Sequence, residues 1–136
     1  MANPTAAEAQ IKIEQAAAEA KSGLREIARI EVGQAIRQGD VYLRRLAAFP
    51  AAHGNETPNR QLAPGTTQGS RHCVEGEATI YAPLEMADRL TGPVIEARGR
   101  IVITHPEHAH FALPAGFYQV TYQRDFAQEE VDRVED

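Results

Sequence analysis

Short apolar segments that alternate with glycine and proline are the feature of this sequence that most constrains its fold. About six or seven such segments follow residue 30, and turn-forming residues bound them on both sides. They are not separated by amphipathic helices, as the strands of a parallel α/β sheet would be. The pattern therefore predicts a mainly β fold, built as a small antiparallel β-barrel or sandwich.

The first 30 residues have a different composition. Thr5 and Glu8 have the spacing of a capping box, and good helix formers continue to about Arg29. Apolar residues recur there at alternating steps of four and three, at Ile13, Ala17, Ala20, Leu24 and Ile27. We therefore predict a long N-terminal α-helix over residues 1–30. Its stripe either packs on the sheet of its own domain or mediates self-association or docking to a protein partner.

The rest of the chain divides into a β-rich domain, residues 31–125, and an acidic C-terminal tail, residues 126–136. A length of 136 residues suits one domain with a modest core. Residues 47–70 are rich in Ala, Pro, Gly, Asn and Thr, which predicts a long loop. Loops of this length in compact domains are often functional or mobile.

Charge and cysteine content exclude several classes of protein. The net charge of −5 disfavours nucleic-acid binding, and no apolar run approaches the roughly 20 residues of a membrane span. Cys73 is the single cysteine, so no intrachain disulfide can form, and one thiol is compatible with a reducing compartment. We expect a cytoplasmic protein, or one within a phage or bacterial assembly formed there.

Three of the five histidines lie within six residues, at His105, His108 and His110, with Glu107 between them. If the chain is extended here, His108 and His110 share one face, because side chains repeat every two residues along a strand. His72 could add a ligand from another strand. Imidazole and carboxylate are ligands of Zn, Fe and Mn, so these four histidines are candidate metal ligands.

A structural explanation of the same residues remains open. Histidines near a turn are often surface groups or hydrogen-bond partners of the backbone. Cys73 lies beside His72, but adjacent strand residues point to opposite faces, which disfavours a Cys–His nucleophile. A third possibility is an anion site, if neighbouring strands bring together Arg44, Arg45, Arg71, Arg98 and Arg100.

Several segments resemble a family of uncharacterised small proteins of bacteria and phages. The family motifs are QGDV, GHxH, THxEH and LPxGxYxVxxQREY, and they occur in this order. The matching segments are residues 37–41, 69–72, 104–108, 113–120 and 123–126, so the resemblance covers about residues 37–126.

By this resemblance, His72, His105 and His108 match family histidines, whereas Ser70 stands where the family has the first histidine of GHxH. His108 and His110 also form the His-x-His pair of cupins, which are small metal-binding β-barrels. The similarity to cupins is weak, since the glutamate and the later histidine of the cupin set are missing.

Two functions follow as predictions. The first is a non-catalytic binding or assembly module with an oligomerising or docking helix, with or without a histidine-bound metal. The second is a cupin-like metal-dependent hydrolase or oxygenase. It would use Glu107 as acid or base and four metal ligands, His72, His105, His108 and His110.

Overall fold

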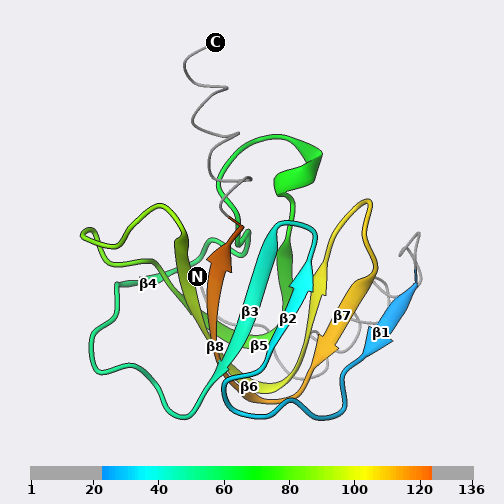
Figure 1. Cartoon of the computed structure of the whole chain (residues 1–136), viewed down its shortest axis with the longest axis horizontal. Coiled ribbons are helices and arrows are strands. Elements are labelled where there is room, and N and C mark those ends of the chain that lie inside the picture. Colours follow the sequence, from blue (N-terminus) through cyan, green and yellow to red (C-terminus); the bar gives the residue numbers. More distant parts are fainter. Residues whose placement is uncertain (1–22, 124–136) are drawn as a thin grey trace.

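Eight strands of one sheet make up most of the regular structure in residues 23–123, the part of the chain that the computed structural model describes (Figure 1). One short 3-10 helix, η1 (Gln68–Ser70), interrupts the connection between β4 and β5. The strands are β1 (Leu24–Glu26), β2 (Ala35–Gln38), β3 (Val41–Leu46), β4 (Glu56–Thr57), β5 (Cys73–Tyr81), β6 (Thr91–Thr104), β7 (His110–Leu113) and β8 (Gly116–Tyr122).

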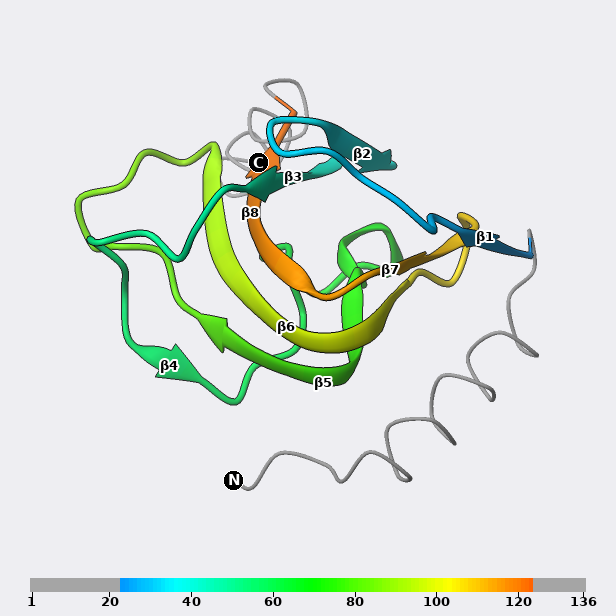
Figure 2. The ribbon, with the colours of Figure 1, turned by 90° about the horizontal axis from the view of Figure 1, so that it is seen from below.

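Strand β6 organises the sheet because it has partners along both edges. The order is β1-β7-β6-β8-β3-β2, with β5 also paired to β6 and β4 paired to β5. Along one edge of β6, residues 91–97 pair with β8 and residues 101–103 pair with β7. Its other edge pairs with β5 over nearly the whole length of that strand. Figure 2 shows β6 curving through the sheet, so the strands wrap as a half-barrel.

The curl is accommodated at a bulge in β5 between Gly76 and Ala78. Gly76 has φ +121, and a Cβ atom there would lie 2.8 Å from the carbonyl oxygen of Arg100. Only glycine fits this backbone position. Arg98 and Gly99 lie inside the continuous strand β6, and the bulge is in its partner β5.

The predicted long N-terminal helix is wrong. Residues 24–26, which the prediction places inside that helix, form β1, and residues 23–123 contain no α-helix. Gly23 has a positive φ of +85, which a helix does not accept, and β1 then pairs with β7. The remainder of the predicted helix, residues 1–22, lies outside the described residues, as does the predicted acidic tail of residues 126–136.

The predicted antiparallel barrel or sandwich also needs correction. The described strands form one curled sheet, and its two end strands, β1 and β2, are not paired with each other. The β1–β7 pair is parallel, with Leu24 opposite His110. A parallel pair requires a long connection between the strands, and here the chain passes through β2 to β6 before β7 joins β1.

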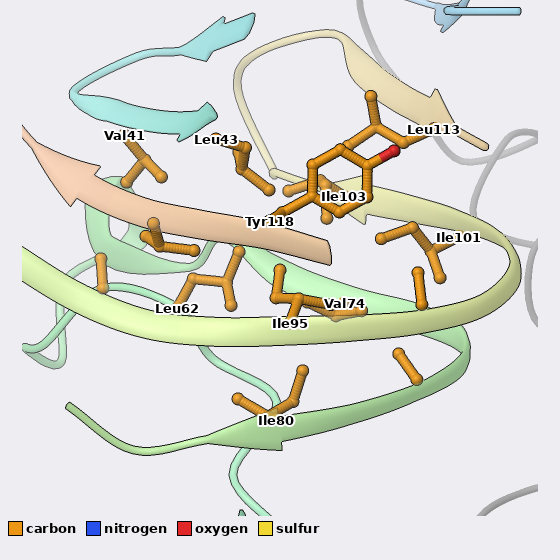
Figure 3. Packing of buried hydrophobic residues seen from close by; sticks show 14 of the residues in the cluster. Val41, Leu43, Leu62, Val74, Ile80, Ile95, Ile101, Ile103, Leu113 and Tyr118 are labelled. Carbon is orange, nitrogen blue, oxygen red and sulfur yellow. The ribbon is translucent and has the colours of Figure 1, made fainter. Parts of the chain in front are cut away.

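Apolar side chains on the concave side of the sheet form the main core (Figure 3). Along β3, Val41 and Leu43 are fully buried while Arg44 is exposed, the alternation expected of a strand with one face on the core. Tyr118 is also fully buried, and its hydroxyl donates to the carbonyl oxygen of Pro114 at 2.6 Å. Burying one apolar side chain such as Leu43 stabilises the folded state by about 1.5–3 kcal/mol.

The predicted loop of residues 47–70 contains structure of its own. It includes β4 and η1, and Leu62 from its middle is buried in the main core. The backbone N–H of Leu62 donates to the carbonyl oxygen of His72 at 2.7 Å. Within residues 23–123, no helix is long and apolar enough to cross a membrane.

We predict that Gly76→Ala lowers the free energy of unfolding by about 2–4 kcal/mol, because it adds backbone strain and a clash with a neighbouring main chain. Gly99→Ala is the matched control, since its Cβ atom would approach nothing closer than 3.9 Å. Chemical denaturation of both variants measures the difference. An equal loss in the two variants would contradict the role assigned to Gly76.

Candidate functional site

Three segments that are far apart in the sequence meet at one end of the sheet. They are the β2–β3 turn, residues 69–72 with η1, and the β6–β7 connection (Figure 1). The ring centroids of His72 and His105 are 4.4 Å apart, and those of His105 and His108 are 4.6 Å apart. We call these three residues the imidazole stack. His72 and His105 are buried, whereas His108 is exposed.

A buried glutamine holds the imidazole stack against the sheet. Gln38, at the end of β2, is only 1% exposed. Its Nε2 donates to the carbonyl oxygens of Ile103 at 3.0 Å and Ala109 at 2.8 Å. Its Oε1 lies 2.8 Å from Nδ1 of His72. Because the Gln38 nitrogen faces two carbonyls, the oxygen must accept, and His72 therefore carries its proton on Nδ1.

His105 has both of its ring nitrogens in use. Its Nδ1 accepts from the backbone N–H groups of Glu107 at 3.0 Å and His108 at 3.1 Å. Its Nε2 lies 3.1 Å from the carbonyl oxygen of Gly69, to which it donates. An acceptor at Nδ1 and a donor at Nε2 define a neutral imidazole of one tautomer. His105 thus joins the β6–β7 connection to the segment that contains η1.

Burial keeps the inner imidazoles neutral. The pKa of His72 is lowered to about 3, mainly by burial and also by the neighbouring His105 and His108, while the Gly69 backbone opposes the shift. Burial also lowers the pKa of His105. The Gly69 backbone and Glu107 oppose that change, and His108 and His110 add to it. At neutral pH both rings therefore act as uncharged hydrogen-bonding groups.

Gly39 allows the β2–β3 turn to approach the imidazole stack closely. It has φ +57, and a Cβ atom there would lie 2.8 Å from Nε2 of His108 and 3.4 Å from Cε1 of His72. The turn backbone therefore packs directly on two of the three rings. A larger residue would need both an unfavourable φ and a displaced ring.

His110 lies apart from the imidazole stack. The expected shared face with His108 required an extended chain, but residues 106–108 form a bend and β7 begins only at His110. His110 donates from Nε2 to the carbonyl oxygen of His105 at 3.0 Å. Its Nδ1 is buried and has no hydrogen-bond partner among the described residues. His110 thus supports the backbone of the connection rather than joining the three rings.

The arrangement limits the metal chemistry available. In residues 23–123 there is no group of three or more His, Cys, Asp or Glu residues that could hold a metal ion. His105 has no free lone pair while its three hydrogen bonds persist, and one nitrogen of His72 is bound to Gln38. Glu107, the candidate acid or base, is exposed, and its backbone N–H donates to His105.

The other candidate groups are dispersed or unreactive. Arg44 and Arg45 donate to carbonyl oxygens of Gly33 and Ile30, so they hold loop backbone in place. Arg98 binds Thr79 and Glu96, and Arg100 pairs with Glu26 at 2.7 Å. The pKa of Cys73 is raised, first by burial and then by Glu75. A raised pKa keeps the sulfur as a thiol, which is a poor nucleophile.

Sequence reasoning missed Gln38. Nothing in the local sequence shows whether the Gln38 carboxamide is buried with three hydrogen bonds or is exposed. The signal that could have found it is the QGDV motif, since turn formation alone does not require a glutamine before Gly39.

The comparisons with other proteins identify a family but no characterised relative. The family model described as "Domain of unknown function (DUF8820)" matches residues 37–123. This range begins just before Gln38, ends after β8, and includes all three members of the imidazole stack. No curated protein and no solved structure matches the chain.

We predict that Gln38→Met, which keeps the side-chain volume, lowers the free energy of unfolding by about 3–5 kcal/mol. The cost arises because two buried carbonyls and the His72 N–H lose their partner. Gln34→Met is the control, because within residues 23–123 that exposed amide makes one local hydrogen bond, which it accepts from the N–H of Glu31. Its effect should stay within about 0.5 kcal/mol. Similar denaturation midpoints for both variants would refute the role of Gln38.

We also predict that Gly39→Ala disturbs the imidazole stack. Gly33→Ala is the matched control, since it has a positive φ of +88 but nothing within 4 Å of the added Cβ. Both variants should lose about 1 kcal/mol from backbone strain. Only Gly39→Ala should shift the imidazole NMR signals of His72 and His108. Unchanged imidazole signals in Gly39→Ala would contradict the close packing.

Proposed function

The chain belongs to the DUF8820 family, a domain of unknown function, and we propose that it is a non-catalytic binding module. The observation that carries the proposal is the use of the imidazole stack as a structural support. The side chains of Gln38, His105 and His110 make seven hydrogen bonds. Six of these bonds are to backbone groups, and the seventh joins Gln38 to His72. The cluster thereby supports a surface instead of presenting reactive groups.

The supported surface consists of connections at the end of the sheet. Residues 64–69 are all exposed, while the flanking Ala63 and Ser70 are buried. Gly69, the last exposed residue of this stretch, accepts from His105. Glu107 and His108 are exposed on the neighbouring connection. A surface made of connections held by a rigid sheet is a common arrangement for recognising a partner.

We propose that the binding partner is a protein and that the module acts in the cytoplasm. The charge of −5 makes nucleic acid an unfavourable partner, because phosphate contacts require an excess of basic side chains. The single cysteine fits a reducing compartment.

A metal-dependent enzyme is the second candidate, and the observation that favours it is the close approach of three imidazoles, at 4.4 and 4.6 Å between ring centroids. It ranks below the binding module, because a metal on His105 would have to displace either the hydrogen bond to Gly69, which joins two segments, or the bond from Glu107 within the β6–β7 connection. An enzyme of this kind would also need an acid or base beside the metal.

The proposal predicts that charge added to the surface abolishes partner binding without affecting the fold. Thr66→Arg changes an exposed residue just before η1, and Gln68→Arg changes the exposed first residue of η1. Ala51→Arg, at an exposed residue of the β3–β4 connection, is the control. In quantitative affinity capture with the full chain, we expect one partner protein to be recovered with the wild type and with Ala51→Arg. The amount recovered should be at least tenfold larger than with either of the two surface variants. Circular dichroism should be unchanged.

Metal analysis separates the two candidates. Near-stoichiometric Zn, Fe or Mn in protein purified without chelator, lost in a His105→Ala, His108→Ala double variant, would favour the enzyme. A partner that binds all variants equally would refute the binding surface proposed here.

A further inference from the structure

We propose that the outer face of the sheet carries a second docking surface, an aromatic platform that binds an arginine side chain of a partner protein. The aromatic platform consists of four rings in mutual contact, those of Phe49, His53, Tyr81 and Phe117. It lies at the end of the sheet opposite to the imidazole stack, so it goes beyond the binding function proposed above and does not depend on it.

Neighbouring residues in β5 and β8 show which face of the sheet the aromatic platform occupies. Ile80 and Tyr118 point into the main core (Figure 3), and successive side chains of a strand point to opposite faces. Tyr81 and Phe117 therefore lie on the outer, convex face. Figure 2 shows that the β3–β4 connection, which carries the other two rings, runs around the outside of the curl.

Strand register separates the aromatic platform from the imidazole stack. Strand β8 begins at the aromatic platform and ends at Tyr122, which is opposite Val41 beside the β2–β3 turn. Strand β5 likewise runs from Cys73, next to His72, to Tyr81. Variants of one surface therefore leave the other surface intact.

The rings of the aromatic platform support one another and remain accessible. The ring centroid of Phe49 lies 4.6 Å from that of His53 and 4.8 Å from that of Tyr81, and the fourth ring is 5.8 Å away. His53 is exposed and the other three rings are half-buried, and none of them belongs to the main core. A ligand thus meets a preformed aromatic surface.

Two carboxylates lie beside the aromatic platform. Glu56 on β4 is the cross-strand partner of Tyr81, so the two side chains point to the same face. Burial raises the pKa of the Tyr81 hydroxyl, Glu96 and Glu56 raise it further, and Arg98 opposes them. Arg98 pairs with Glu96 at 3.3 Å, whereas Glu56 has no ion pair in the described part of the chain. A cation on the aromatic platform would find an available carboxylate there.

Two other aromatic rings of this chain already hold a guanidinium. Cζ of Arg37 lies 5.7 Å from the ring centroid of Tyr42, and Cζ of Arg25 lies 5.8 Å from that of Phe111. Among residues 23–123, no arginine is placed in this way over a ring of the aromatic platform. The aromatic platform thus offers a ring face and a carboxylate to a guanidinium from another molecule.

Arginine suits this combination better than lysine does. Its planar guanidinium can stack on an aromatic face and also donate from its edge to a carboxylate. The ammonium of lysine is a compact and strongly hydrated charge, so it gains less from a ring face. We therefore expect the partner protein to present an exposed arginine.

A peptide titration followed by NMR on the full chain tests the aromatic platform. The probe is a blocked glycine–arginine–glycine peptide, and its control carries citrulline, which keeps the planar shape of arginine without the charge. The arginine peptide should shift the ring signals of Tyr81 and Phe49 to saturation, with a Kd lower than that of the citrulline peptide by about threefold or more. Equal Kd values for the two peptides, or shifts confined to other parts of the chain, would overturn the proposal.

Two variants locate the contact. Glu56→Gln removes the carboxylate at an exposed position, and Tyr81→Leu removes the ring. Each should weaken binding of the arginine peptide by about threefold or more. The controls are Glu75→Gln, which removes a carboxylate at the other end of β5, and Tyr42→Leu, which removes a ring that already holds Arg37. Both controls should bind as the wild type. Unchanged affinity in Glu56→Gln or in Tyr81→Leu, or an equal loss in the matching control, would refute the assignment.

Discussion

The carboxamide of Gln38 is the interaction on which the end of this half-barrel depends. Among the described strands, β2 pairs only with β3, so its backbone alone does not hold it to β6 or β7. Gln38 makes that connection with two donated hydrogen bonds, to Ile103 and Ala109, and accepts a third from His72. A buried amide is stable only when both its nitrogen and its oxygen are satisfied, and here each atom has a single possible role.

This constraint determines the character of the histidines. Once His72 must donate to Gln38 and His105 must accept from two backbone N–H groups, both rings are neutral and their tautomers are defined. Burial supports the same protonation state. Imidazoles in such an arrangement organise neighbouring backbone. The proposed binding role derives from this use of histidine as a neutral hydrogen-bonding group.

The curl of the sheet brings these groups together. Strand β6 exchanges β8 for β7 along one edge, and the bulge at Gly76 lets β5 follow its curvature. As a result, the β2–β3 turn and the β6–β7 connection lie at one end, although about 65 residues separate Gln38 from Ile103. The apolar core lies within the curl and contains none of the three histidines, so the polar cluster and the core are separate sources of stability.

By itself, the sequence determined the β-rich character of the chain, the segments that carry the family motifs and the family to which the chain belongs. Short apolar runs, glycine and proline carry that information locally, as does the order of the motifs. The sequence did not determine that residues 24–26 join a parallel strand pair, since their helical periodicity is overridden by pairing with β7. Nor did it show that His110 would separate from His108 or that Gln38 would be buried. Tertiary structure decided these points, because a hydrogen bond between residues 38 and 103 depends on how the whole sheet curls, and no local pattern encodes that curl.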